Sequence, residues 1–221
     1  MNRTSPMSLA DCDRHGIGSG AELFVVEGES AAAAVARVRD AAFQAVLPIR
    51  GKPLNAARAG AARVAGHPVY AALAVALGTG LGAGFDAAGL RFERVLVLMD
   101  PDADGIHCGA LLLTFFARWM RPLVEAGRVG VVRPPWGEVG VPGGGGERAW
   151  SEDEFRLLAA ARGGPAAARR YRGLGSIDAE TLRATCVCPA SRRVERATAA
   201  AVDGLLARLG GRGIRPADPG G

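Results

Sequence analysis

The sequence has few residues of several polar kinds, and this scarcity gives weight to the exceptions. Lys52 is the only lysine among 27 basic residues, asparagine occurs only at Asn2 and Asn55, and there are two tyrosines. Arginine, alanine, glycine and proline are abundant instead, which is typical of a GC-rich coding sequence. A lysine kept against such a bias is expected to be needed as a lysine, because a compact ammonium and a planar guanidinium are not equivalent.

Long apolar runs and paired cysteines are also missing. The most apolar stretch, residues 110–120, is interrupted by Arg118 and is too short to span a bilayer, and the first 16 residues have no apolar stretch typical of a signal peptide. The four cysteines include no CxxC pair, and Cys186 and Cys188 alone cannot supply the four ligands of a structural zinc site. We therefore expect a cytoplasmic protein with reduced thiols and no membrane partner.

The bulk composition permits a folded domain with an anionic partner. Hydrophobic residues make up 49% of the 221 residues, which suffices for one large domain or for one domain with a small appendage. The net charge of +5 suits nucleic acid. Many proteins of similar charge bind none, so composition alone leaves this open.

Short apolar runs alternate with helical patterns, which predicts an α/β fold with a parallel sheet flanked by helices. The run at residues 95–99 is continuous, as in a parallel strand covered on both faces. Strands are predicted at residues 23–26, 45–49, 95–99 and 129–132. Helices are predicted after Ser30, which can act as a cap, and at residues 67–82 and 109–123.

The predicted organisation places one α/β domain between less regular segments. Residues 1–20 are expected to be a flexible lead-in, and 137–149 a flexible Gly-rich loop. The region 150–215 is predicted to be mostly helical, with a turn at 171–175, and to pack on the α/β domain at 21–136. Residues 216–221 are expected to be a disordered tail.

Acidic residues follow two of the predicted strands. Glu27 ends the first, and Asp100, Asp102 and Asp104 come directly after the strand at 95–99. Ligands of open α/β sheets bind beyond the carboxyl ends of the strands, so four carboxylates would converge there if these strands are neighbours. Their mutual repulsion is relieved by a hard cation such as Mg²⁺, whose natural chemistry is phosphoryl transfer on a phosphodiester.

The aspartate cluster has other interpretations. Asp100-x-Asp102-x-Asp104-Gly105 matches the opening of a calcium loop, but the twelfth position holds Leu111 where a bidentate glutamate is required. A strand that ends in DxD also resembles haloacid-dehalogenase-like phosphatases, which need a downstream lysine that this chain does not have. A plain acidic turn at a strand end stays open.

Taken together, the segments resemble the TOPRIM region of the B subunits of DNA gyrase and topoisomerase IV, the type IIA topoisomerases. The resemblance runs in order from about residue 20 to about residue 216, and it includes the rare residues Lys52, Asn55 and Tyr171. The matching segments are ELFVVEGESA at 22–31, LPIRGKPLN at 47–55, ALGTG at 76–80, LRF at 90–92, MDPDADGIH at 99–107, LLLTFF at 111–116, MRPL at 120–123, RYRGLG at 170–175 and DAE at 178–180.

The resemblance implies a Rossmann-like TOPRIM fold and a set of roles. Glu27, Asp100 and Asp102 would be catalytic, and with Asp104 they would hold one or two Mg²⁺ ions during DNA cleavage and resealing. The nucleophilic tyrosine of this family belongs to the A subunit, so the implied partners are DNA and a gyrase A-like subunit. The residues implied to contact DNA are Arg50, Lys52, Asn55, His107, Tyr171 and Arg172.

The chain also departs from the family pattern. Ala32 and Ala33 stand where two glycines are usual, Arg172 replaces a lysine, and Cys188 stands where an aspartate is usual. The family's N-terminal ATPase region has no counterpart here and no Gly-rich nucleotide site replaces it, so no ATP site is expected in this chain. ATP coupling would have to come from a separate ATPase-bearing chain. The expected location is the cytoplasm, at the nucleoid.

Three functional hypotheses follow. In the first, the chain is the Mg²⁺-dependent cleavage and religation module of a type II topoisomerase. In the second, it is a catalytically inactive gyrase-B-like paralogue that binds DNA or the A subunit. The third, a separate TOPRIM nuclease or primase, is disfavoured by the RGK and YRGLG segments, which are specific to the topoisomerase branch. The sequence does not distinguish gyrase from topoisomerase IV.

Overall fold

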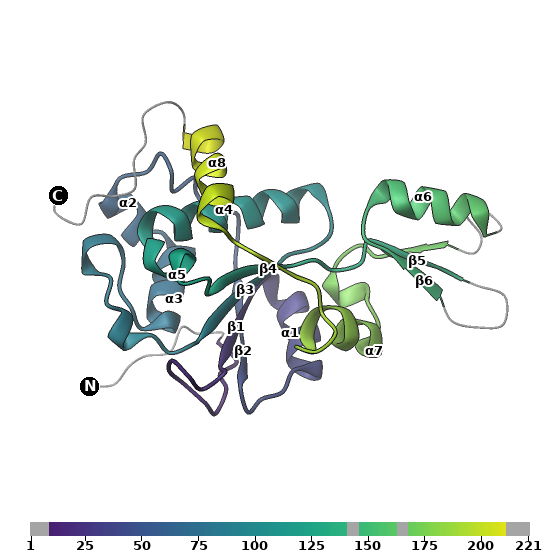
Figure 1. The fold of residues 1–221 in the computed structure, drawn as a ribbon, viewed down its shortest axis with the longest axis horizontal. Helices are drawn as coiled ribbons and strands as arrows, with labels where there is room; N and C mark the ends of the chain where they lie inside the picture. Colours follow the sequence, from purple (N-terminus) through teal and green to yellow (C-terminus); the bar gives the residue numbers. More distant parts are fainter. Residues whose placement is uncertain (1–8, 141–145, 163–167, 211–221) are drawn as a thin grey trace.

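A five-stranded, mostly parallel sheet forms the centre of the computed structural model, which describes residues 9–140, 146–162 and 168–210 (Figure 1). The strand order is β2-β1-β3-β4-β8; the first four strands are parallel and β8 pairs antiparallel with β4. The strands are β1 (Glu22–Glu27), β2 (Gln44–Ile49), β3 (Arg94–Leu98), β4 (Val129–Val132) and β8 (Val194–Arg196). This arrangement confirms the predicted α/β fold class.

Helices cover both faces of this sheet. Alternate residues of a strand point to opposite faces, and the central strands follow this rule: Val25 and Val97 belong to one buried cluster, Val26 and Leu98 to another. The first face carries α3 (Pro68–Leu77), α4 (Ala103–Trp119), α5 (Arg121–Glu125) and α8 (Ala199–Gly210) (Figure 1). The second carries α1 (Gly28–Val38), the 3₁₀ turn η4 (Leu174–Ser176), α7 (Ala179–Leu182) and the π-helical η5 (Arg183–Val187).

Two predicted helix starts are wrong. Helix α4 begins at Ala103 rather than near residue 109, because the Asp102 carboxylate accepts a hydrogen bond from the Gly105 N–H at 2.8 Å and caps the helix. Ser30 is not a cap, since α1 already begins at Gly28 and includes it. Three shorter elements lie between β2 and β3: α2 (Ala61–Ala65) and the 3₁₀ turns η1 (Gly82–Gly84) and η2 (Ala87–Gly89).

A second, antiparallel sheet lies beside the main one, in a unit that projects to one side in Figure 1. It consists of β5 (Gly137–Gly140), β6 (Gly146–Ala149) and β7 (Ala168–Arg170), and α6 (Glu152–Ala161) packs on it. The predicted loop at 137–149 is therefore wrong for these strands, while 141–145 lie outside the described residues. Gly137 is a packing residue, because a Cβ there would lie 2.5 Å from the Phe155 ring.

The C-terminal region is helical in large part, but it also contributes strands β7 and β8. Helix α8 packs against α4, and α7 and η4 pack against α1. The predicted tail at 216–221 lies outside the described residues. Among the residues that are described, no helix is both long and apolar enough to cross a membrane.

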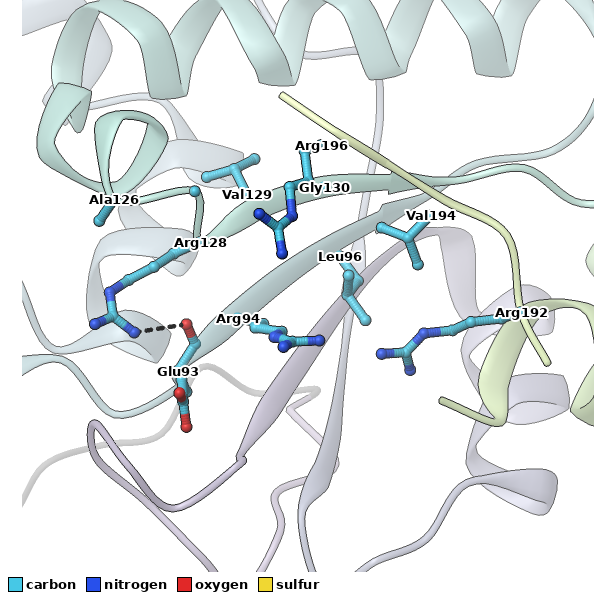
Figure 2. A pocket seen from close by; sticks show the side chains of 11 residues that line it. Glu93, Arg94, Leu96, Ala126, Arg128, Val129, Gly130, Arg192, Val194 and Arg196 are labelled. Carbon is cyan, nitrogen blue, oxygen red and sulfur yellow. Dashed lines mark hydrogen bonds between the residues drawn. The ribbon is translucent and has the colours of Figure 1, made fainter. Parts of the chain in front are cut away.

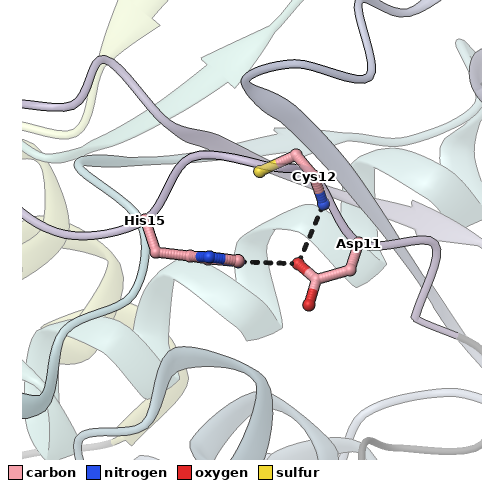
Figure 3. A group of neighbouring side chains, drawn as sticks. All are labelled: Asp11, Cys12 and His15. Carbon is pink, nitrogen blue, oxygen red and sulfur yellow. Dashed lines mark hydrogen bonds and ion pairs between the residues drawn. The ribbon is translucent and has the colours of Figure 1, made fainter.

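The predicted flexible lead-in is wrong for residues 9–20, whereas residues 1–8 lie outside the described part. Ala10 pairs with Val46 through two backbone hydrogen bonds of 2.9 Å, and Cys12 is buried. Asp11 forms ion pairs with His15 and Arg91 (His15 shown in Figure 3). These contacts fasten the segment to the edge strand β2 and to the loop before β3.

Candidate metal centre

The carboxyl ends of β1 and β3 bring acidic side chains from distant parts of the sequence together. The two strands are parallel neighbours in which Val26 stands opposite Leu98, so both strands leave the sheet at the same edge. Glu27 is the last residue of β1, and Asp104 lies in the first turn of α4. Their carboxylate oxygens lie within 4.8 Å of each other and of the Cys108 sulfur.

Sequence reasoning missed Cys108 as a member of this group. It lies one helical turn after Asp104, and its Sγ is 4.0 Å from Glu27 Oε1. The signal was the i, i+4 spacing from Asp104, which places two side chains on one helix face only if the helix already includes residue 104. Burial, with help from Glu27 and Asp104, raises the pKa of Cys108 to about 11, so near neutral pH it is a thiol and not a thiolate.

The other two aspartates are held by the backbone. Asp100 accepts a hydrogen bond from the Leu174 N–H at 2.9 Å, and Gly173 lies so close that a Cβ there would be 2.8 Å from Asp100 Oδ2. Asp102 uses one oxygen to cap α4. Both lie outside the close group formed by Glu27, Asp104 and Cys108 in the described structure. The RYRGLG turn therefore positions Asp100, although Leu174 is 74 residues away in sequence.

Charge at the site is unbalanced. Lys52 Nζ lies 2.5 Å from Asp104 Oδ1, and this contact lowers the pKa of Asp104 and raises that of Lys52. Burial raises the pKa of Glu27, and the negative charges of Asp104, Asp100 and Asp102 raise it further. Burial also raises the pKa of Asp100. The four carboxylates therefore outnumber the one ammonium that forms an ion pair with them in the described structure.

This donor set fits Mg²⁺. The carboxylates offer hard oxygen ligands at one edge of the sheet, and a divalent cation would remove the repulsion that raises the pKa of Glu27. The sulfur of Cys108 is a soft atom that Mg²⁺ does not favour, so it adds nothing to the hard oxygen ligands. The fit rests on the oxygen atoms of Glu27 and Asp104, with Asp100 and Asp102 close enough to add negative charge.

The residues expected to contact DNA divide into two groups. Arg50, Lys52, His107 and Arg172 are exposed. Arg50 forms a 2.8 Å surface pair with Glu29, with side chains 68% and 57% exposed, and pairs of this kind hold their partners weakly. These four side chains are available to a ligand.

Asn55 and Tyr171 are engaged in the fold instead. Asn55 Nδ2 donates to the Leu209 carbonyl at 2.9 Å, and its Oδ1 accepts from the Ala57 N–H, so it ties α8 to the loop after β2. Tyr171 is 1% exposed and packs in the cluster under α1. Burial, together with the nearby Glu138 carboxylate, raises its pKa. A direct DNA contact by Tyr171 is a correction to the expected set, because its ring has no surface to offer.

The alanines that replace the usual glycines lie in α1 and not against the acidic group. Ala32 is buried in the cluster beneath α1, and Ala33 is exposed. The close backbone approach here is made by Gly175, where a Cβ would be 2.7 Å from Ser30 Oγ. The two substitutions therefore change the packing and the surface of α1 without filling the metal centre.

A second group of metal-ligand types occurs near the N-terminus, where Asp11, Cys12 and His15 place ligand atoms within 4.8 Å of one another (Figure 3). Arg91 contacts both Asp11 and His15, with Nη2 2.9 Å from His15 Nε2. Because this guanidinium already occupies the space facing both side chains, the group is an ion-pair cluster that fastens the N-terminal segment.

Comparisons with known proteins agree with the fold. The Toprim domain model matches residues 22–134. The B subunit of DNA gyrase from Archaeoglobus fulgidus is 40% identical over 190 residues, which are 86% of this chain and 29% of that protein. The B subunit of DNA gyrase from Thermus thermophilus is 38% identical over 219 residues, which are 96% of this chain and 34% of that protein.

The B subunits of DNA topoisomerase 4 match this chain at similar sequence identity. The B subunit of DNA topoisomerase 4 from Streptococcus pneumoniae is 38% identical over 180 residues, which are 80% of this chain and 28% of that protein. The chain thus spans about a third of the length of the curated relatives it matches. It belongs to the Toprim domain family, and over most of its length it is similar to the B subunits of DNA gyrase and DNA topoisomerase 4.

Proposed function

We propose that this chain forms the Mg²⁺-dependent DNA cleavage and religation module of a type II topoisomerase. It would act with an A-type subunit that supplies the nucleophilic tyrosine. The observation that carries the proposal is the meeting of Glu27 and Asp104 at the shared edge of β1 and β3, with Asp100 and Asp102 beside them. ATP-driven strand passage would need an ATPase that the described residues do not provide.

Some of the acidic side chains would bind the ion, and backbone contacts would hold others in position. Glu27 and Asp104 would hold the ion, Asp102 would offer the oxygen that does not cap α4, and the Leu174 N–H would fix Asp100 in place. Bound Mg²⁺ would stabilise the negative charge that develops on phosphodiester oxygens during cleavage and resealing. The fixed aspartates would keep these ligands in position before DNA arrives.

DNA would be held by the exposed basic residues around this edge. Lys52 is exposed and bound to a single carboxylate, so it can exchange Asp104 for a DNA phosphate. Arg50, His107 and Arg172 are exposed as well, and contacts of these types to phosphate are independent of sequence. Binding to DNA should therefore weaken steeply as the salt concentration rises.

A cleavage assay tests the proposal. The chain, an A-type subunit and supercoiled DNA are incubated with Mg²⁺, and linear product is trapped by denaturation. Asp102→Asn is expected to abolish cleavage, and Asp153→Asn, an exposed aspartate in the first turn of α6, should leave it unchanged. Full cleavage by the Asp102 variant would contradict the metal assignment.

One observation favours a second candidate, a B-like protein that binds its partners without chemistry. Cys108 places a protonated thiol inside the close group, where a protonated sulfur is a poor ligand for Mg²⁺. Under this candidate the wild-type chain would bind DNA or the A-type subunit and still show no heat of Mg²⁺ binding. Cleavage by the wild-type mixture would exclude it.

A further inference from the structure

A cavity lies at the opposite end of β3 from the acidic group. Its volume is about 250 Å³, and it opens between the start of β3, the turn before β4 and the edge strand β8 (Figure 2). Four arginines and one acidic residue line it: Arg94, Arg128, Arg192, Arg196 and Glu93. Arg94 and Asp100 stand six residues apart along an extended chain, about 20 Å, so this cavity is separate from the metal centre.

Three of these arginines carry charge that the described residues do not neutralise. Arg94 and Arg196 have no carboxylate within ion-pair distance in the described structure, and Arg128 donates only to the backbone carbonyl of Glu93, at 3.1 Å. Arg192 is neutralised by Glu22. Three positive charges against the single carboxylate of Glu93 leave two in excess at the cavity.

Arg192 adds a buried donor that lacks an acceptor. Its Nη atoms donate to the Glu22 carboxylate and to the Val187 carbonyl, but its Nε has no hydrogen-bond partner among the described residues although the atom is buried. A buried N–H without an acceptor is costly. Figure 2 shows the guanidinium groups of Arg94, Arg192 and Arg196 around one space. An anion placed in this space would neutralise the excess positive charge.

We propose that this cavity binds a small phosphate compound, of about the size of pyrophosphate, as a site distinct from the metal centre. Guanidinium groups bind phosphate oxygens in a bidentate manner, which several converging arginines permit from different sides. Leu96, Val129 and Val194 line the same cavity between the arginines. The volume admits one or two phosphate groups and is small for a whole drug-sized ligand.

Calorimetric titration with inorganic pyrophosphate tests this inference. The buffer is free of divalent metal, so that pyrophosphate cannot bridge to an ion at the carboxylates, and KCl holds the ionic strength constant. Saturable 1:1 binding is expected. The double variant Arg94→Gln, Arg196→Gln should bind about a hundredfold more weakly, because each lost charged donor costs about tenfold. Both side chains are exposed, so the fold should survive, as melting curves would verify.

The matched control is Arg37→Gln, which removes an exposed arginine from α1, away from the cavity. It should bind pyrophosphate as the wild type does. Arg192 stays intact in all variants because its buried pair with Glu22 supports the fold. An absence of pyrophosphate binding to the wild-type chain would overturn the proposal, as would equal weakening by Arg37→Gln.

Further titrations separate the sources of the phosphate group. Binding of a nucleoside diphosphate more tightly than pyrophosphate would identify a nucleotide as the ligand, and the reverse order would identify free pyrophosphate; both support the site. Titration with a short DNA duplex tests the alternative that the arginines bind the DNA backbone. If the double variant loses duplex affinity while pyrophosphate never binds, the arginines are a DNA-backbone surface and the proposal is wrong.

Discussion

Removal of the guanidinium of Arg192 should strongly destabilise the fold. Its side chain is 2% exposed and that of its partner Glu22, the first residue of the inner strand β1, is 4% exposed. In Arg192→Met, the Glu22 carboxylate would keep only the Gln44 amide at 2.9 Å and would remain buried without a countercharge. Breaking a buried pair in this way costs about 3–5 kcal/mol. The total stability of a domain is about 5–15 kcal/mol.

The comparison that decides this is a second arginine–glutamate pair on the surface. Arg133 and Glu195 lie 2.9 Å apart with side chains 49% and 62% exposed, so Arg133→Met should cost less than about 1 kcal/mol. Urea denaturation monitored by circular dichroism measures both variants, and the midpoints are comparable if the slopes agree. Equal shifts for the two variants would refute the reasoning that burial decides the cost.

Three further predictions concern local contacts. Asp178→Ala removes the carboxylate that accepts the Thr181 N–H at 2.8 Å and should cost about 0.5–2 kcal/mol in urea denaturation. This hydrogen bond lowers the pKa of Asp178 in the folded chain. The carboxylate therefore stabilises the fold fully at a pH above its ordinary pKa of 3.8, and this stabilisation is lost as the pH falls through the lowered pKa. A difference in unfolding free energy between wild type and variant that does not change with pH would contradict this. Gly173→Ala would force a Cβ against Asp100 and should weaken Mg²⁺ binding in calorimetry, whereas unchanged affinity would show that the turn does not position Asp100. Lys52→Met should weaken duplex binding and reduce the salt slope by about 1, and an unchanged slope would exclude a phosphate contact.

The centre of the molecule could be predicted well from the sequence because apolar runs mark strands buried on both faces. The runs at 23–26 and 95–99 form the neighbouring strands β1 and β3, and the acidic residues follow their ends. Such runs indicate their own burial, since a strand covered on both sides cannot alternate with polar residues. The position of the acidic edge followed from this pattern.

Features that depend on contacts between distant segments escaped prediction. The glycines at 137, 140 and 146 favour a flexible loop by composition, although Gly137 is required by the packing of the Phe155 ring. Cys108 joins the acidic group only because Asp102 starts α4 early enough to include Asp104. The arginine cavity is assembled from β3, the turn before β4 and β8, and no local pattern indicates that these segments meet.

Titration of the metal-free chain with MgCl₂ in a calorimeter tests the central claim most directly. The account predicts saturable binding to the wild type, its loss in Glu27→Gln and its retention in Asp153→Asn. Cys108→Ala should also retain it, because the oxygen atoms are the expected ligands. No heat of binding in the wild type, or equal binding by Glu27→Gln, would contradict a metal centre built from these two strand ends.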